Sequence, residues 1–150
     1  MRRGHSEYEM KQMLGRRTGD DHLLKTVMDR LKRAKMIDDE QFAKQFVRQR
    51  TEIRRQGKFR IARDLRARGV SDRHIEAALR ETAKETDEAV IVRQRLERKL
   101  RSFRGGIDEN KVASIYRSLL RAGFSAEVVR RELKAVTRQE VPEAESQPED

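Results

Sequence analysis

Clustered carboxylates are the first side chains in this sequence that could do chemistry. Asp38, Asp39 and Glu40 are consecutive, and neighbouring carboxylates can bind a metal ion or act as general acid and base. They also stand where an apolar-periodic segment begins, and acids in that place satisfy free backbone N–H groups and the helix dipole. Asp108 and Glu109 precede a second such segment. We therefore interpret both clusters as helix caps.

The other residue types that carry catalysis are sparse or isolated. His5, His22 and His74 lie far apart, with no partner at the three- or four-residue spacing of a zinc site, and the chain has no cysteine. Gly105 and Gly106 are not followed by the Lys-Ser/Thr pair of a phosphate-binding loop. The sequence therefore predicts a protein that is not an enzyme and has neither a cofactor nor a metal.

Cationic side chains are the stronger signal. From Lys44 to Arg68 the chain has ten Lys or Arg against two acids, so pairing within helices cannot neutralise them. Arginine binds phosphates or carboxylates through bidentate hydrogen bonds, which predicts salt-dependent binding of a polyanion with little sequence preference. The central candidate set is Arg48, Arg54, Arg55, Lys58, Arg60, Arg63, Arg66 and Arg68. A second set is Arg98, Lys99, Arg101 and Arg104.

The overall composition agrees with a basic binding protein. The 150 residues are 35% hydrophobic and 41% charged, with a net charge of +10. The last eleven residues, 140–150, hold five acids and no base, so residues 1–139 carry +15. The acidic stretch is predicted to be a disordered tail. Because no segment has the apolar length of a signal or a membrane span, we expect a cytoplasmic protein without membrane contact.

Helical periodicity and capping residues define the elements that position these cations. Ser6 is predicted to cap a first helix, and Gly57 is predicted to end the helix that Asp38 caps. Ile53 on that helix, and Phe59 on the next, are expected to face inward with aliphatic neighbours. The same spacing makes the five Phe and two Tyr residues more consistent with a core than with stacking on nucleic-acid bases.

An internal repeat organises the helices. Residues 65–79 and 119–133 share Leu, Gly, an apolar residue, Ser, Ile or Val, and Leu at a shift of 54 residues, and a fainter copy lies 51 residues upstream of the first. A glycine stop followed by a serine cap is also common between unrelated helices, but here the apolar spacing agrees on both sides of the turn. We predict an all-α fold, an elongated curved array of tandem three-helix repeats. The expected units are 1–37, 38–83 and 84–139.

Four blocks together resemble a known family. They are RRGHSEYEMKQML (2–14), IDDEQFAKQFVRQR (37–50), GKFRIARDLRARGVSDRHIEAAL (57–79) and RSLLRAGFSAEVVRREL (117–133). In order and spacing they resemble the RecX family of bacterial proteins that modulate RecA. The resemblance covers roughly residues 2–135. Longer members have a further leading helix, so the first unit is expected to be incomplete.

The resemblance implies a function that the composition alone does not. It implies a regulator that binds the groove of the RecA filament, inhibits recombinase and ATPase activity, and limits filament growth during DNA repair, recombination and the SOS response. The implied partners are the RecA filament and single- or double-stranded DNA within it, contacted by a monomer. The alternative left open by the charge is a stand-alone nucleic-acid-binding helical protein without sequence preference.

Overall fold

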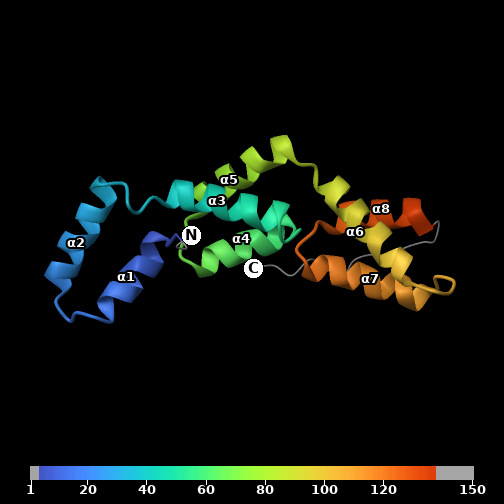
Figure 1. The fold of residues 1–150 in the computed structure, drawn as a ribbon, viewed down its shortest axis with the longest axis horizontal. Coiled ribbons are helices and arrows are strands. Elements are labelled where there is room, and N and C mark those ends of the chain that lie inside the picture. Colours follow the sequence, from blue (N-terminus) through green and yellow to red (C-terminus); the bar gives the residue numbers. More distant parts are fainter. Residues whose placement is uncertain (1–3, 138–150) are drawn as a thin grey trace. The chain divides into compact units, whose positions relative to one another are not determined.

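Every regular element of the described chain is an α-helix (Figure 1). The structure is a computed structural model, and it describes residues 4–137. This confirms the all-helical prediction, while the predicted tail at 140–150 lies outside the described residues. In these residues, no helix is both long and apolar enough to cross a membrane. The helices are α1 Glu7–Gly15, α2 Asp21–Arg33, α3 Asp39–Glu52, α4 Lys58–Ala67, α5 Asp72–Glu85, α6 Glu88–Ser102, α7 Glu109–Arg121 and α8 Ala126–Thr137.

The chain divides into two compact units that alternate along the sequence. Unit 1 contains the described residues up to Gln49 together with Ala62–Thr82. Unit 2 contains Arg50–Ile61 together with the described residues from Ala83 onward. These two units are defined by which residues pack together, whereas the units 1–37, 38–83 and 84–139 were defined by the sequence repeat. The limits of the three repeat units therefore stay a prediction. All contacts described below lie within one unit or the other.

Ser6 joins the first helix to a distant turn in unit 1. Its side chain is fully buried, and Oγ accepts a hydrogen bond from the backbone N–H of Glu9 at 3.1 Å. The same hydroxyl donates to the carbonyl oxygen of Arg68 at 2.6 Å. The predicted cap is therefore confirmed, and it has a second, long-range role because a buried hydroxyl needs partners for both its donor and its acceptor.

The acidic clusters serve as caps. Asp38 Oδ1 accepts from the N–H of Gln41 at 3.3 Å, and Asp39 Oδ1 accepts from the N–H of Glu7 at 2.8 Å, at the start of α1. Asp108 caps α7. No group of three or more His, Cys, Asp or Glu side chains within residues 4–137 is placed to hold a metal ion. The capping interpretation is confirmed.

Two turns repeat the same backbone geometry. Gly69 has φ of 77°, and its N–H bonds three residues back at 2.9 Å while that of Val70 bonds five residues back at 3.1 Å. Gly123 has φ of 96°, and Gly123 and Phe124 form the same two bonds at 3.0 and 3.2 Å. This is the glycine-terminated helix end in which a left-handed residue satisfies free carbonyls. The turn supports the repeat found in the sequence.

Unit 2 is built on three mutually packed helices. Helix α6 packs against α8 and α7, and α7 packs against α8. Leu96, Leu133 and Phe124 are essentially inaccessible to solvent at the centre of this cluster. Full burial of each such side chain contributes roughly 1.5–3 kcal/mol relative to exposure. The three helices therefore form a rigid support for the side chains on their outer faces.

The end of α3 differs from the prediction. The helix ends at Glu52, five residues before the glycine that was expected to stop it, and Arg55 takes the left-handed conformation with φ of 53°. Because the helical period stops there, Ile53 is 74% exposed. Phe59, on α4, is 43% exposed. The expectation that Ile53 and Phe59 face inward was wrong.

Gly57 has a different role from the predicted stop. A Cβ at this position would lie 2.2 Å from the carbonyl carbon of Gly123. The N–H of Gly57 donates to the carbonyl oxygen of Ala122 at 2.8 Å, and that of Phe59 donates to Gly123 at 3.0 Å. The α3–α4 turn and the α7–α8 turn are therefore joined by backbone bonds that need the absence of a side chain.

Candidate polyanion-binding site

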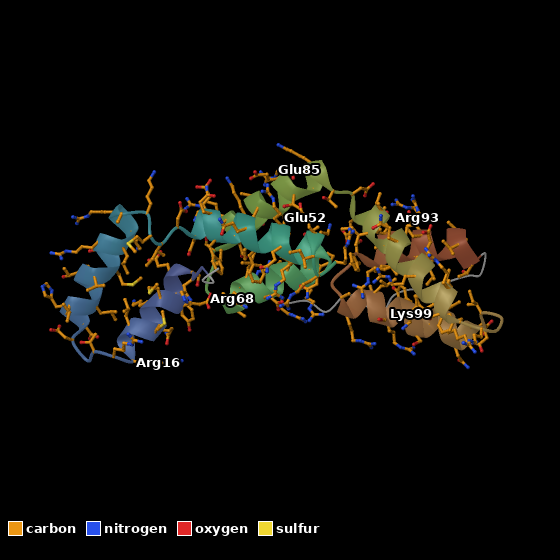
Figure 2. All side chains as sticks on the ribbon, viewed as in Figure 1. Arg16, Glu52, Arg68, Glu85, Arg93 and Lys99 are labelled. Atoms are coloured by element: carbon orange, nitrogen blue, oxygen red, sulfur yellow. The ribbon has the colours of Figure 1, made fainter. Side chains whose placement is uncertain are left out.

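One face of α6 carries a run of polar donors. Arg98 and Lys99 each lie three or four residues from Arg95 and from Ser102, which places the four side chains in a stripe on one side of the helix. Lys99, labelled in Figure 2, projects from α6. Val92 and Leu96, beside this stripe, are buried in the core, whereas Arg98, Lys99 and Ser102 are exposed, so this part of the stripe faces solvent.

The α3–α4 turn brings more cations to this stripe. Arg95 Nη1 donates a hydrogen bond to the carbonyl oxygen of Arg55 at 2.8 Å. The Arg95 guanidinium also lies over the ring of Phe124, 5.6 Å from its centroid, which is a favourable cation–π geometry. Arg95 thereby connects the turn to α6 and presents Arg54 and Arg55 beside it.

The turn, α6 and α7 together line a cavity of about 560 Å³ within unit 2. Among residues 4–137, its lining contains five cationic side chains and no carboxylate. Ile91, Ile115 and Leu119, all buried, contribute apolar surface. We call this cavity the cationic pocket, and it is lined by Ile53, Arg54, Arg55, Ile91, Gln94, Arg95, Arg98, Lys99, Ser102, Ile115, Ser118 and Leu119.

Arg95 holds its charge in an unfavourable environment. Partial burial lowers the pKa of Arg95 from its ordinary value, and the neighbouring positive charges of Arg60 and Arg98 lower it further. A guanidinium remains protonated at neutral pH in spite of such a shift. The charge is therefore retained without a compensating acid in the part of the chain that the structure describes, and an anion in the pocket would relieve the mutual repulsion.

Elsewhere in unit 2 a cation on α6 is matched by an acid. Arg93 donates from Nε and Nη2 to the two carboxylate oxygens of Glu132 at 3.0 and 3.2 Å. Hydrogen bonding to Glu132 raises the pKa of Arg93. The contrast between Arg93 and the pocket cations shows that the same helix carries both a neutralised face and an unmatched one.

The structure gathers four of the candidates from the sequence. Arg54 and Arg55 of the central set meet Arg98 and Lys99 of the second set at the pocket. Lys58, Arg60, Arg101 and Arg104 belong to unit 2 but do not line it, and Arg48, Arg63, Arg66 and Arg68 belong to unit 1.

Two of the unit 1 candidates bind carboxylates of the chain itself. Arg66 Nε donates to Asp72 at 2.8 Å. Arg68 pairs with Glu9 at 3.4 Å and lies over the ring of Phe46, 5.0 Å from its centroid. These contacts give both arginines a part in holding unit 1 together.

Arg95 lines the candidate pocket but was not among the candidates from the sequence. Its spacing from Arg98 and Lys99 was a signal that could have found it, because three- and four-residue separations share a helix face. No pattern in the sequence indicated that the uncharged polar side chains of Gln94, Ser102 and Ser118 would also line the pocket.

Comparison with known proteins shows the family. Residues 38–79 match the family domain described as "RecX, second three-helix domain". The regulatory protein RecX of Halorhodospira halophila is 36% identical over 131 residues, covering 86% of this chain and 78% of that protein. The regulatory protein RecX of Prosthecochloris aestuarii is 30% identical over 131 residues, covering 87% and 83%. The chain belongs to the RecX family.

The RecX fold is shared with solved structures as well. The crystal structure of RecX from Lactobacillus salivarius superposes with a TM-score of 0.77 at 20% identity, covering 90% of this chain and 87% of that one. The matched RecX domain includes α3 and α4. It therefore also contains the turn that supplies Arg54 and Arg55 to the pocket.

Replacing Arg95 tests whether it organises the pocket of this RecX-family chain. We expect Arg95→Met to lower the free energy of unfolding by about 1 kcal/mol, the typical contribution of one hydrogen bond. Arg101→Gln is a matched control, since it removes one charge from an exposed position of the same helix outside the pocket. Urea unfolding followed by circular dichroism measures both. Equal stability of the two variants would contradict the bridging role of Arg95.

Proposed function

We propose that this protein is a non-enzymatic regulator that binds the RecA filament in its groove and inhibits recombinase activity, ATPase activity and filament growth. Membership of the RecX family, whose curated relatives are named regulatory proteins, carries the proposal. A RecA filament assembled on DNA is a polyanionic partner of the kind that an unmatched cationic pocket suits. The protein would thereby modulate DNA repair and recombination.

The residues support a mechanism based on binding. Arg54, Arg55 and Arg98 can each donate two parallel hydrogen bonds to an anionic group. Such contacts, spread over a filament, would hold neighbouring subunits or their DNA in one arrangement. Subunit addition and the movements that accompany ATP turnover would then be suppressed without any chemistry by this chain.

Inhibition of ATP hydrolysis tests the proposal directly. We expect the purified protein to reduce the ATPase rate of RecA filaments on single-stranded DNA at stoichiometric amounts, because each bound molecule restrains the subunits it contacts. Phosphate release measured over a titration gives the result. An unchanged rate at one protein per subunit would refute inhibition of the filament.

The net charge of +15 over residues 1–139 favours a second candidate function, which is stand-alone binding of nucleic acid. In that case the protein binds nucleic acid by itself and does not recognise the recombinase. A pull-down that compares bare DNA with RecA-coated DNA distinguishes the two functions. Preference for the coated strand supports the regulator, whereas equal capture or preference for bare DNA supports the stand-alone binder.

A further inference from the structure

We propose that the cationic pocket of unit 2 binds the phosphodiester backbone of a single nucleic-acid strand. The inference rests on the proposed function and narrows it, because it assigns this surface to the DNA and not to the recombinase. The observation behind it is that the described residues lining the pocket include four arginines and one lysine but no carboxylate.

The pocket cations are available for a ligand. Arg54, Arg55, Arg98 and Lys99 are all exposed. Among residues 4–137 none of these four forms an ion pair. Their charges lie in one cavity, and like charges held together without partners destabilise the fold until an anion binds. A bound polyanion is the natural partner for this arrangement.

The donors match phosphates in type and in spacing. Arginine presents a planar fork that fits phosphate oxygens, and Ser102, Ser118 and Gln94 add neutral donors of the kind that contact phosphate and sugar. Arg95, Arg98 and Ser102 stand on successive turns of α6, about 5.4 Å apart along the axis. A row of donors at that interval suits consecutive phosphates of one strand better than a single isolated anion.

The size of the pocket favours a single strand. A cavity of about 560 Å³ lies within the roughly 300–1,000 Å³ range of sites that enclose small ligands. It can receive a nucleotide or two of an extended chain. A duplex is a wide, stiff cylinder, so it would contact only the rim.

The lining also predicts how the strand is read. No aromatic side chain of the described residues lines the pocket, and Phe124, which lies beneath Arg95, is 1% exposed. Bases therefore have no ring on which to stack, which is the usual platform in single-strand binders. The pocket should therefore contact the phosphates and sugars of the strand, and its affinity should not depend on the base sequence.

The test measures binding of a labelled oligothymidylate of about 12 nucleotides, long enough for one site, by fluorescence anisotropy. The pocket variant is Arg54→Gln with Arg98→Gln and Lys99→Gln. The matched control is Arg16→Gln with Arg30→Gln and Arg33→Gln, which removes the same charge from exposed positions of unit 1. Circular dichroism confirms that both variants are folded.

We expect the pocket variant to lose at least tenfold more affinity for the strand than the control. Its slope of log K against log salt should be shallower by about 2, since each neutralised phosphate of a single strand contributes about 0.7. The wild type should bind the duplex and polyglutamate more weakly than the single strand. Equal losses in the two variants, or stronger binding of duplex or polyglutamate, would overturn the assignment.

RecA ATPase assays with the same variants separate this inference from the proposed function. If the pocket variant binds the free strand normally but no longer inhibits, the pocket contacts the recombinase, so the inference fails while the regulator stands. If the wild type does not inhibit at all, the regulator fails, and the oligonucleotide titration still decides what the pocket binds.

Discussion

Gly57→Ala is expected to lower the free energy of unfolding by at least about 3 kcal/mol, because overpacking typically costs 1–3 kcal/mol and broken hydrogen bonds about 1 kcal/mol each. The new methyl group would lie 2.2 Å from the carbonyl carbon of Gly123 and 2.3 Å from the N of Phe124. These are backbone atoms, so no side chain can rotate away. The turns must separate, and the bonds from Gly57 to Ala122 and from Phe59 to Gly123 are lost.

The size of this effect can be checked by urea unfolding, with the midpoint read by circular dichroism. Gly106→Ala is the control, because a Cβ at Gly106 meets nothing within 4 Å. That variant should change stability by less than about 0.5 kcal/mol, as expected for a surface substitution. A Gly57→Ala protein as stable as Gly106→Ala would mean that the two turns are not held together.

Binding to single-stranded DNA is expected to weaken about 100-fold between 50 and 200 mM salt if all five pocket cations each neutralise one phosphate with a slope of about 0.7. The physical reason is release of counterions from the strand when protein cations replace them. Titrations at four or more salt concentrations give the slope directly. Further phosphate contacts outside the pocket would make the dependence steeper.

The salt titration can be controlled by changing the anion of the added salt. Replacing chloride with glutamate at constant ionic strength should preserve the slope, because the released ions come mainly from the DNA. An affinity that changes less than about threefold over the same range would correspond to roughly one phosphate contact. That result would contradict a pocket in which several cations act together.

Local chemistry made much of the fold predictable. The caps at Ser6, Asp38 and Asp108 were correctly predicted because each acts on backbone N–H groups a few residues away. Gly69 and Gly123 were correctly placed at helix ends, since glycine adopts positive φ without the steric cost that a side chain brings. These features depend on residues only a few positions apart, so a short stretch of sequence is enough to predict them.

Tertiary contacts explain what the sequence did not show. Gly57 was assigned to a helix end, yet its function depends on Gly123, 66 residues later. The left-handed conformation fell on Arg55 instead, where it is held by a hydrogen bond from Arg95. The pocket depends on the same distant pairing, so the two basic sets could be identified from the sequence but their meeting at Arg54, Arg55, Arg98 and Lys99 could not.

The alternation of the two units along the chain has a topological consequence. Unit 2 begins at Arg50, gives way to unit 1 at Ala62 and resumes at Ala83. No single cut of the polypeptide can therefore release either unit free of residues that belong to the other. A fragment ending before Ala83 would keep Arg54 and Arg55 but lack α6, and one starting at Ala83 would keep α6 and lose the segment that donates to Ala122 and Gly123. During synthesis, the lining of the cationic pocket cannot close until α7 has emerged from the ribosome.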